Sequence, residues 1–261
     1  MLGTGAVTGL ANAQLLYMLP VSLFGMSVAA AELPAMAGEA GLDRAGYEAL
    51  RGRLDSGLRR IAFMVVPSAM AFLALGDIIA AALFETGRFQ HEDALRVWAI
   101  LAGSAVGMLA STLGRLYASA YYALRDTRTP LRYAIVRVIL TTALGYMCAI
   151  PLPRWLGIDP LWGTAGLTAS AGVAGWVEMI LLRRTLNARI GRTGLSAGHV
   201  ARLWVSAGLG AGIAWGVKLA MPALHPVLLA IAILAPFGLV YLGSTAALGV
   251  PEARRLLRDR A

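Results

Sequence analysis

The sequence predicts an all-α membrane protein, a polytopic bundle of about seven transmembrane helices. Of its 261 residues, 58% are hydrophobic and only 14% are charged, a balance outside the range of water-soluble domains. Long uncharged or weakly charged runs recur along the chain, and at ~1.5 Å per residue each can cross most of a bilayer core of roughly 30 Å. Short polar or basic connections separate the runs, as in multi-pass membrane proteins.

The expected spans follow the apolar runs in order. They cover residues 1–31, 61–84, 97 to a polar break at 126–130, 131–153, 160–182, 203–221 and 226–250. The first run contains Pro20, and neighbouring helices must satisfy the carbonyl that this proline frees. In the sixth run Gly208, Gly212 and Gly216 recur every four residues, which predicts close packing against another helix.

Residues 43–60, between the first two spans, carry a mixed pattern. Tyr47, Leu50, Leu54 and Leu58 recur at helical spacing among five arginines. We expect this segment to form an amphipathic helix that lies on the membrane surface.

The third span ends at a charged turn that runs from Asp126 to Pro130. Pro130 biases Thr129 away from the helical region, so a new helix is expected only after this turn. We interpret the turn as a tight helix-to-helix connection at a membrane surface.

The basic residues of the connections predict the orientation. Seventeen Lys and Arg lie in one alternate set, residues 32–60, 125–132, 183–202 and 251–261. Only four lie in the other set, residues 85–96, 153–160 and 218–226. By the positive-inside rule the first set and the C-terminus are cytoplasmic, and the N-terminus is external. Because no targeting signal accompanies an external N-terminus, we expect an odd number of spans to precede this chain.

The residue pattern argues against several classes of function. Arginines fall in short clusters between apolar runs, so nucleic-acid binding is not expected. The lone Cys148 can build neither a disulfide within the chain nor a cysteine-rich metal site. His91 and Glu92 lack the second histidine of a zinc-binding HExxH helix, and no phosphate loop or catalytic cluster stands out. We therefore predict no enzyme activity, cofactor or metal.

The best candidate for function is a charge inside the third span. One helical face there is polar: Ser104, Ser111, Arg115, Ser119 and Tyr122. A polar stripe within a span faces a wet cavity, where Arg115 can meet an anionic substrate. The alternative is a structural ion pair between Arg115 and a carboxylate such as Asp77 or Glu178.

Five stretches carry a resemblance to a known family. They read GAVTGLANAQLLYMLPVSLFG at 5–25, LPAMA at 33–37, LRRIAFMVVPSAM at 58–70, LFETGRF at 83–89 and YYALRDTRTP at 121–130. This ordered set resembles the lipid II flippases (MurJ, formerly MviN) of the multidrug/oligosaccharidyl-lipid/polysaccharide exporter superfamily. The resemblance covers essentially the whole chain and is strongest over 5–132.

The resemblance implies the second lobe of a fourteen-helix transporter in the bacterial cytoplasmic membrane. Two lobes enclose a central cationic cavity and flip lipid II, a polyprenyl-diphosphate-linked peptidoglycan precursor, by alternating access. The implied partners are this lipid, membrane lipids and the missing N-terminal lobe, from the same gene or a partner chain. Residues 1–202 form the C-terminal lobe, and 203–261 form the final helix pair, with a groove for the lipid tail, and the cytoplasmic C-terminus.

The residues that we expect to bind the substrate are Gln14, Ser111, Arg115, Ser119 and Tyr122. Of these, Arg115 falls where the resembled family often has a basic residue, and Gln14 belongs to its first-span motif. The family's first-span motif usually reads Ala-Gln-Arg-Leu or Ala-Asp-Arg-Leu, whereas Leu15 stands at the arginine position here. We expect Arg115, or an arginine of the other lobe, to supply the missing positive charge.

Two alternatives stay open at this point. The substrate can be another polyprenyl-linked polysaccharide precursor. A protein of a different class, a seven-helix receptor-like membrane protein, also fits seven spans with an external N-terminus. A retinal protein of that class needs a lysine in its last span, whereas Lys218 lies near the outer end of the sixth.

Overall fold

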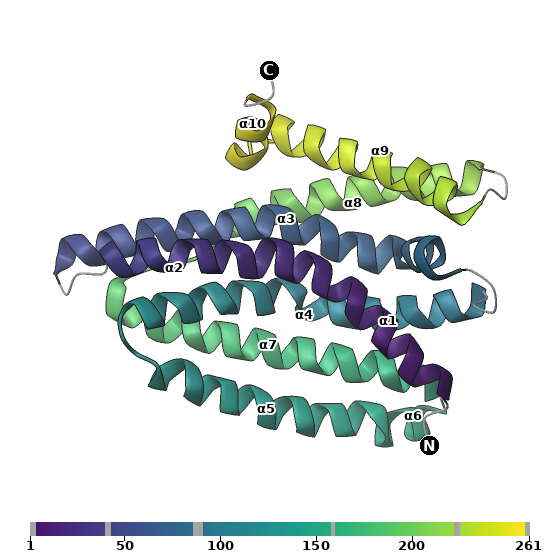
Figure 1. Ribbon diagram of the computed structural model, residues 1–261, viewed down its shortest axis with the longest axis horizontal. Coiled ribbons are helices and arrows are strands. Elements are labelled where there is room, and N and C mark those ends of the chain that lie inside the picture. Colours follow the sequence, from purple (N-terminus) through teal and green to yellow (C-terminus); the bar gives the residue numbers. More distant parts are fainter. Residues whose placement is uncertain (1–3, 40–42, 86–90, 158–159, 222–224, 259–261) are drawn as a thin grey trace.

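The computed structural model describes residues 4–39, 43–85, 91–157, 160–221 and 225–258, and every element in these ranges is a helix (Figure 1). In chain order they are α1 (Thr4–Pro20), η1 (Val21–Met26), α2 (Ser27–Glu39), α3 (Arg44–Phe84), α4 (His91–Ala123), α5 (Arg128–Ala149), α6 (Pro151–Leu156), α7 (Pro160–Ile190), α8 (Ala197–Ala220), α9 (Pro226–Ala247) and α10 (Pro251–Arg258). Within the described ranges, 7 helical stretches are long and apolar enough to cross a membrane. The predicted fold class is confirmed.

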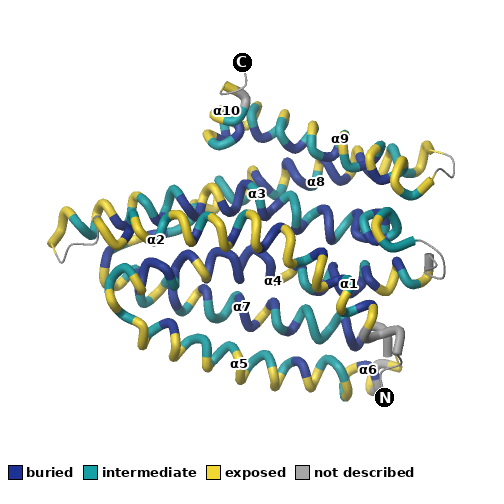
Figure 2. The backbone as a smooth tube through the Cα atoms, in the orientation of Figure 1, coloured by how far each residue is buried: buried dark blue, intermediate teal, exposed yellow. Residues whose placement is uncertain are grey.

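Helices α5, α7, α4 and α3 are successive neighbours, and the α8–α9 pair lies beyond α3 (Figure 1). The first span, α1 to α2, crosses over α3 and α4 and contacts both. Helix α4 is the centre of the bundle and is buried along most of its length, whereas the residues of α5 are nearly all intermediate or exposed (Figure 2). Most of α4 is therefore surrounded by protein. A charged residue on the exposed face of this helix is a candidate for function.

The segment 43–60 is not a separate helix, as the sequence led us to expect, but the first part of α3. This helix runs unbroken for 41 residues from Arg44 to Phe84, and the Asp43 side chain caps it by accepting from the Gly46 N–H at 3.0 Å. Leu50, Leu54 and Leu58 are buried in the main core. Their apolar stripe packs against other helices of the bundle, so it does not have to lie on lipid.

The glycines of α7 and α8 differ in how closely they approach neighbouring helices. In α7, Gly172 approaches Gly107 of α4 so closely that a Cβ on Gly172 would lie 2.7 Å from the Gly107 nitrogen, as expected for tight helix packing. In α8, added Cβ atoms on Gly208, Gly212 and Gly216 would meet nothing within 4 Å among the described residues. The predicted packing role of these three is wrong, because α8 turns another face toward its neighbours.

Apart from the short α10, the described helix that the α8–α9 pair contacts is α3. A second apolar core lies between this pair and α3. It is formed by Ala71, Leu75, Ile78, Ala211, Ala214, Ala230, Ile233 and Phe237. Near the other end of α9, the Tyr241 hydroxyl donates to the Phe63 carbonyl of α3 at 2.6 Å. The division into 1–202 and 203–261 stays a prediction.

Candidate functional site

The polar face of α4 is only partly open. Arg115 is exposed and Tyr122 is 47% exposed, whereas Ser111 and Ser119 are buried. The Ser111 hydroxyl donates to the Met108 carbonyl at 3.0 Å, and that of Ser119 to the Arg115 carbonyl at 3.2 Å. A serine has one O–H, so neither has a proton left to donate to a ligand. Arg115 and Tyr122 are the members of this face that the surface presents.

Helix α1 contributes to the same region through a tyrosine that the sequence analysis did not single out. The Tyr17 hydroxyl lies 3.1 Å from Ser111 Oγ, and because Ser111 donates to a carbonyl, Tyr17 is the donor in this pair. Gln14, one turn earlier on α1, is exposed, and no hydrogen bond described for this part of the chain joins it to Arg115. Leu15 is 64% exposed. Polar periodicity on one helix could not reveal Tyr17, because its partner is 94 residues away.

The structural ion pair considered for Arg115 is wrong. Asp77 accepts from Lys218 Nζ at 2.6 Å, and Glu178 accepts from Arg137 Nη1 at 3.0 Å. Within the described ranges, no carboxylate lies within ion-pair distance of Arg115. An arginine in mid-span costs ~2.5 to 3.5 kcal/mol on insertion scales unless it faces water or a partner. Arg115 therefore needs an aqueous surface or a partner outside the described residues.

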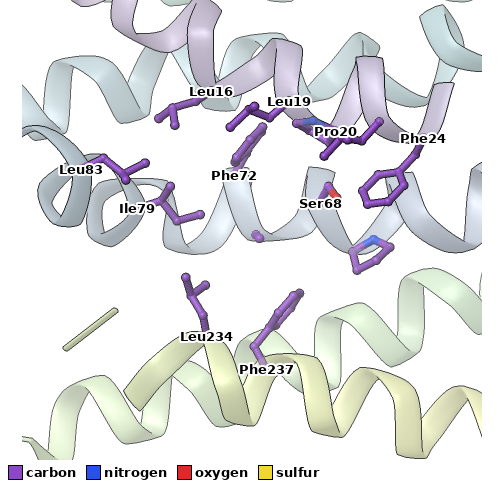
Figure 3. A pocket seen from close by; sticks show the side chains of 13 residues that line it. Leu16, Leu19, Pro20, Phe24, Ser68, Phe72, Ile79, Leu83, Leu234 and Phe237 are labelled. Carbon is purple, nitrogen blue, oxygen red and sulfur yellow. The ribbon is translucent and has the colours of Figure 1, made fainter. Parts of the chain in front are cut away.

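An apolar cavity of ≈390 Å³ lies between α1, α3 and α9 (Figure 3). Its walls are almost wholly apolar: Leu16, Leu19, Pro20, Leu23 and Phe24 from α1 and η1, Pro67, Ser68, Ala71, Phe72, Ile79 and Leu83 from α3, and Leu234 and Phe237 from α9. We call it the α1–α9 cavity. The tail groove that the resemblance implies along 203–221 and 226–250 stays a prediction; this cavity shares only α9 with it.

The charged turn after α4 is a tight helix-to-helix connection, as predicted, but α5 begins earlier than expected. Asp126 Oδ1 accepts from the backbone N–H groups of Arg128 and Thr129 at 3.1 and 3.0 Å, so these residues already belong to α5. Pro130 is tolerated there because N–H groups in a first helical turn need no partner within the helix. Asp126 Oδ2 also accepts from Arg189 Nη1 of α7 at 2.6 Å.

The environment of Asp126 fixes its charge. Burial alone raises the pKa of this carboxyl, but the hydrogen bonds from Thr129 and the pairing with Arg189 outweigh it and hold the pKa at about 2. Asp126 therefore stays ionised at neutral pH and joins the α4–α5 turn to α7.

A model of the family described as lipid II flippase MurJ matches residues 1–235. The chain belongs to the lipid II flippase MurJ family. It is 30% identical over 182 residues to the probable lipid II flippase MurJ of Rhizobium meliloti, a match that covers 70% of this chain and 32% of that protein. It is 32% identical over 182 residues to the lipid II flippase MurJ of Burkholderia cenocepacia, covering 69% of this chain and 33% of that one.

A solved structure has a similar arrangement of helices. It is a lipid II flippase MurJ in an inward closed conformation, with a TM-score of 0.76 over 98% of this chain and 49% of that chain. At 20% identity, this likeness shows the shared fold alone. The chain thus spans about a third of the curated relatives that it matches and about half of the solved MurJ chain.

Membership of the MurJ family excludes one of the two alternatives that the sequence left open. The chain is a multi-pass protein of the inner membrane and belongs to a family of transporters. The receptor-like interpretation is wrong, and the pairing of Lys218 with Asp77 gives that lysine a structural partner.

Proposed function

We propose that this MurJ-family chain is the second lobe of a flippase that moves lipid II, a polyprenyl-diphosphate-linked peptidoglycan precursor, across the cytoplasmic membrane. A first lobe, on the same polypeptide or a partner chain, faces it, and the two lobes rock between inward and outward states. The observation that carries this proposal is Arg115, a charge inside an apolar span that is exposed and has no carboxylate partner among the described residues.

Arg115 binds the diphosphate of the precursor. The guanidinium is planar and always charged, and its fork of N–H groups matches phosphate oxygens in pairs. Gln14 and Tyr122 are exposed and have protons to donate, so they contact the same headgroup. Ser111 and Ser119 do not donate to the headgroup, because their hydroxyl protons are donated to backbone carbonyls. Ser111 accepts from Tyr17 and so positions that side chain.

The α1–α9 cavity receives part of the polyprenyl tail. Twelve of its thirteen lining residues are apolar, and the exception is Ser68, whose hydroxyl donates to the Met64 carbonyl at 3.0 Å. Such a surface offers no hydrogen bonds to a headgroup and favours hydrocarbon. The headgroup surface on α4 and the tail cavity both border α1, which is the geometry that an amphiphilic lipid needs.

A flippase for another polyprenyl-linked polysaccharide precursor is the second candidate. Leu15 favours it, because this exposed residue stands where the family usually has an arginine, and one charge fewer changes the headgroup that binds. Restoring the family residue with Leu15→Arg and comparing binding of lipid II and of other polyprenyl diphosphate precursors separates the two candidates.

The test of the headgroup contact uses three variants of Arg115 and one control in the complete two-lobe protein. Arg115→Ala is expected to abolish transport of lipid II in proteoliposomes, and Arg115→Lys to retain part of it because the charge remains. Arg115→Gln, which keeps hydrogen-bonding groups without charge, should behave like alanine. Arg44→Ala is the matched control, because Arg44 is almost fully exposed and pairs with Glu48 one turn away on the same helix.

The same preparations report folded protein after heating in detergent. Under the proposed contact, Arg115→Ala folds as well as the parent and loses precursor binding at least tenfold, which corresponds to about 1.4 kcal/mol. Unchanged precursor binding and transport in Arg115→Ala would refute the contact.

A further inference from the structure

Helix α10 follows α9 through a short turn with a defined hydrogen-bond pattern. Gly249 has a left-handed backbone, with φ of 76°, and its N–H donates to the Ala246 carbonyl at 3.2 Å. The Val250 N–H donates to the Thr245 carbonyl at 2.9 Å, which completes a Schellman motif at the end of α9. The side chains of Val250 and Ala253 are buried in the main core. These contacts give α10 one fixed position against the bundle.

The length of α9 places α10 at the surface of the bilayer. Helix α9 has 22 residues and none is charged, so at ~1.5 Å per residue it is about as long as the roughly 30 Å of a bilayer core. The three residues 248–250 separate its last residue from Pro251, the first residue of α10 (Figure 1). Helix α10 therefore lies at the level of the lipid headgroups.

The charges of α10 are divided between its two sides. Glu252 faces the bundle: its side chain is 18% exposed, and its Oε1 lies 3.6 Å from Nε of Arg59 on α3. Arg254 donates from Nε to a carbonyl of the last turn of α9 at 3.4 Å. Arg255 and Arg258 are exposed, and no carboxylate of the described ranges lies within ion-pair distance of either. The outer side of α10 is therefore positively charged.

Arginines of α3 and α8 extend this charge. Arg202 of α8 is exposed, and the side chain of Arg59 is 44% exposed. His199, one turn before Arg202, is within electrostatic reach of Arg59, Arg202 and Glu252, so these three side chains lie around it. We call the four arginines the α8–α10 basic surface: Arg59, Arg202, Arg255 and Arg258. Their positive charges outnumber the single carboxylate of Glu252 that lies among them.

The chemistry of this surface fits the phosphate of an anionic phospholipid. The guanidinium fork of arginine matches phosphate oxygens in pairs, and each basic residue near an anionic leaflet strengthens binding about fivefold. Leu248, which precedes α10, is 42% exposed beside the arginines. Basic and apolar side chains together at headgroup depth suit a lipid, which offers both a phosphate and acyl chains. A soluble polyanion would use only the charge.

We propose that the α8–α10 basic surface binds the headgroup of an anionic phospholipid, phosphatidylglycerol, in the leaflet that the predicted orientation makes cytoplasmic. The bound lipid attaches the ends of α8 and α9 to the membrane surface, on the side of α3 away from α4. This surface shares no residue with the headgroup surface on α4 or with the α1–α9 cavity. The proposal is independent of lipid II transport.

Native mass spectrometry of the intact protein in a neutral detergent measures the binding of single lipids. Phosphatidylglycerol should bind at least tenfold more tightly than phosphatidylcholine. The combined variant Arg202→Gln, Arg255→Gln and Arg258→Gln should lose this preference, and the corresponding lysine variant should retain part of it because the charges remain. Arg59 stays unchanged, because its replacement would leave Glu252 without its partner. An unchanged preference in the glutamine variant overturns the proposal.

The matched control removes the same charge elsewhere on the predicted cytoplasmic side. It combines Arg44→Gln, Arg128→Gln and Arg192→Gln, three arginines that are exposed and lie outside the α8–α10 basic surface. This control should keep the preference for phosphatidylglycerol, and both combined variants should unfold at the temperature of the parent when no lipid is added. An equal loss of preference in the control and in the α8–α10 variant would show a diffuse attraction without a site.

A fluorescent label locates the lipid without any change to the arginines. Bimane is attached at Leu248→Cys in a Cys148→Ser background, and the protein is placed in nanodiscs with lipid that carries a spin label near the top of its acyl chain. Spin-labelled phosphatidylglycerol should quench this bimane more than spin-labelled phosphatidylcholine. Leu228→Cys, a 58% exposed position near the other end of α9, should be quenched equally by both. Equal quenching by the two lipids at both positions refutes the site.

A soluble polyanion is the competing partner, and the same nanodiscs distinguish it. Single-stranded RNA is added at the phosphate concentration of the labelled lipid and at roughly physiological ionic strength, which screens exposed charges beyond about 8 Å. The quenching of Leu248→Cys by phosphatidylglycerol should not change, because RNA makes no apolar contact there. Loss of this quenching on addition of RNA would overturn the assignment to a lipid.

Discussion

Arg115 and the charges around it show how single residues divide between structure and function. The other charges within the spans are tied into the bundle: Asp77 to Lys218 and Glu178 to Arg137. Pairing offsets the cost of a charge in lipid, so these residues hold helices together. Arg115 has no such partner in the described ranges and is exposed, which makes it the residue whose change should alter binding before it alters folding.

Gly25 is a residue at which a larger side chain alone should lower stability. In Gly25→Ala the new Cβ would lie 2.6 Å from Thr112 Cγ2, so α4 or η1 must shift, and overpacking of this kind costs ~1 to 3 kcal/mol. We expect a lower thermal unfolding temperature for the detergent-solubilised protein. Adding Thr112→Ser should recover part of the loss, because it removes Cγ2 and keeps the hydroxyl that bonds the Met108 carbonyl.

The control for this prediction lies in the same span. Gly38→Ala introduces a Cβ that meets nothing within 4 Å among the described residues, and alanine favours helix over glycine by ~1 kcal/mol. Its unfolding temperature should equal or exceed that of the parent. Equal stability of Gly25→Ala and Gly38→Ala would show that η1 does not press on α4.

At the scale of elements, α3 joins the α8–α9 pair to the bundle around α4. It contacts α4 on one side and carries the α8–α9 pair on the other. Near the end of α8, Trp215 Nε1 donates to the Ala74 carbonyl at 2.9 Å, and Lys218 lies 5.2 Å from the Trp215 ring while it pairs with Asp77. These contacts clamp α8 to α3 at the end opposite to the Tyr241 hydrogen bond.

The Asp77–Lys218 pair should show strong coupling in a double-mutant cycle. Asp77→Asn or Lys218→Met alone leaves one charge without its partner in a mostly apolar place, so each single change should lower the free energy of unfolding. The double variant should be more stable than either single variant, with a coupling energy of ~0.5 to 3 kcal/mol. Additive losses would mean that the contact seen at 2.6 Å contributes nothing to docking of α8.

Element boundaries were the part of the fold that the sequence predicted least well. The apolar stripe of 43–60 was recognised, but an amphipathic pattern does not say whether its apolar side meets lipid or another helix, and here it meets the bundle. Likewise, proline chemistry at Pro130 suggested a late start for α5, whereas capping by Asp126 starts it at Arg128. Caps and packing partners decide such ends, and both depend on tertiary contacts.

For the whole molecule, the orientation in the membrane is a prediction that labelling can check. The asymmetry of 17 basic residues against 4 predicts that the turn after α4 and the C-terminus are cytoplasmic. Thr127→Cys in a Cys148→Ser background should not react with a membrane-impermeant maleimide in intact cells and should react after permeabilisation. Labelling of Thr127→Cys in intact cells would show that the predicted orientation is wrong.

Without a first lobe, this chain should not transport lipid II. A cavity between two lobes needs both of them, and the exposed face with Arg115 and Gln14 would otherwise meet lipid. Cells depleted of their lipid II flippase should fail to grow when they express this chain alone and should recover when a matching first lobe is co-expressed. Growth on the chain alone would show that one lobe suffices.

The sequence by itself determined the class of the protein. Apolar runs long enough to cross a bilayer, short basic connections and five ordered motifs are local properties, and they predicted an all-helical membrane protein and its family before any contact was known. They also singled out Arg115, because a charge in an apolar run is visible without its surroundings.

Only the tertiary structure decided what surrounds that charge and its neighbours. Two outcomes depend on contacts between residues far apart in the chain: which carboxylates were already paired, and that Gly25 rather than Gly208 meets another helix. A helical repeat states which residues share a face, but the face that meets protein, lipid or water is set by packing, since in a membrane apolar side chains suit both protein and lipid.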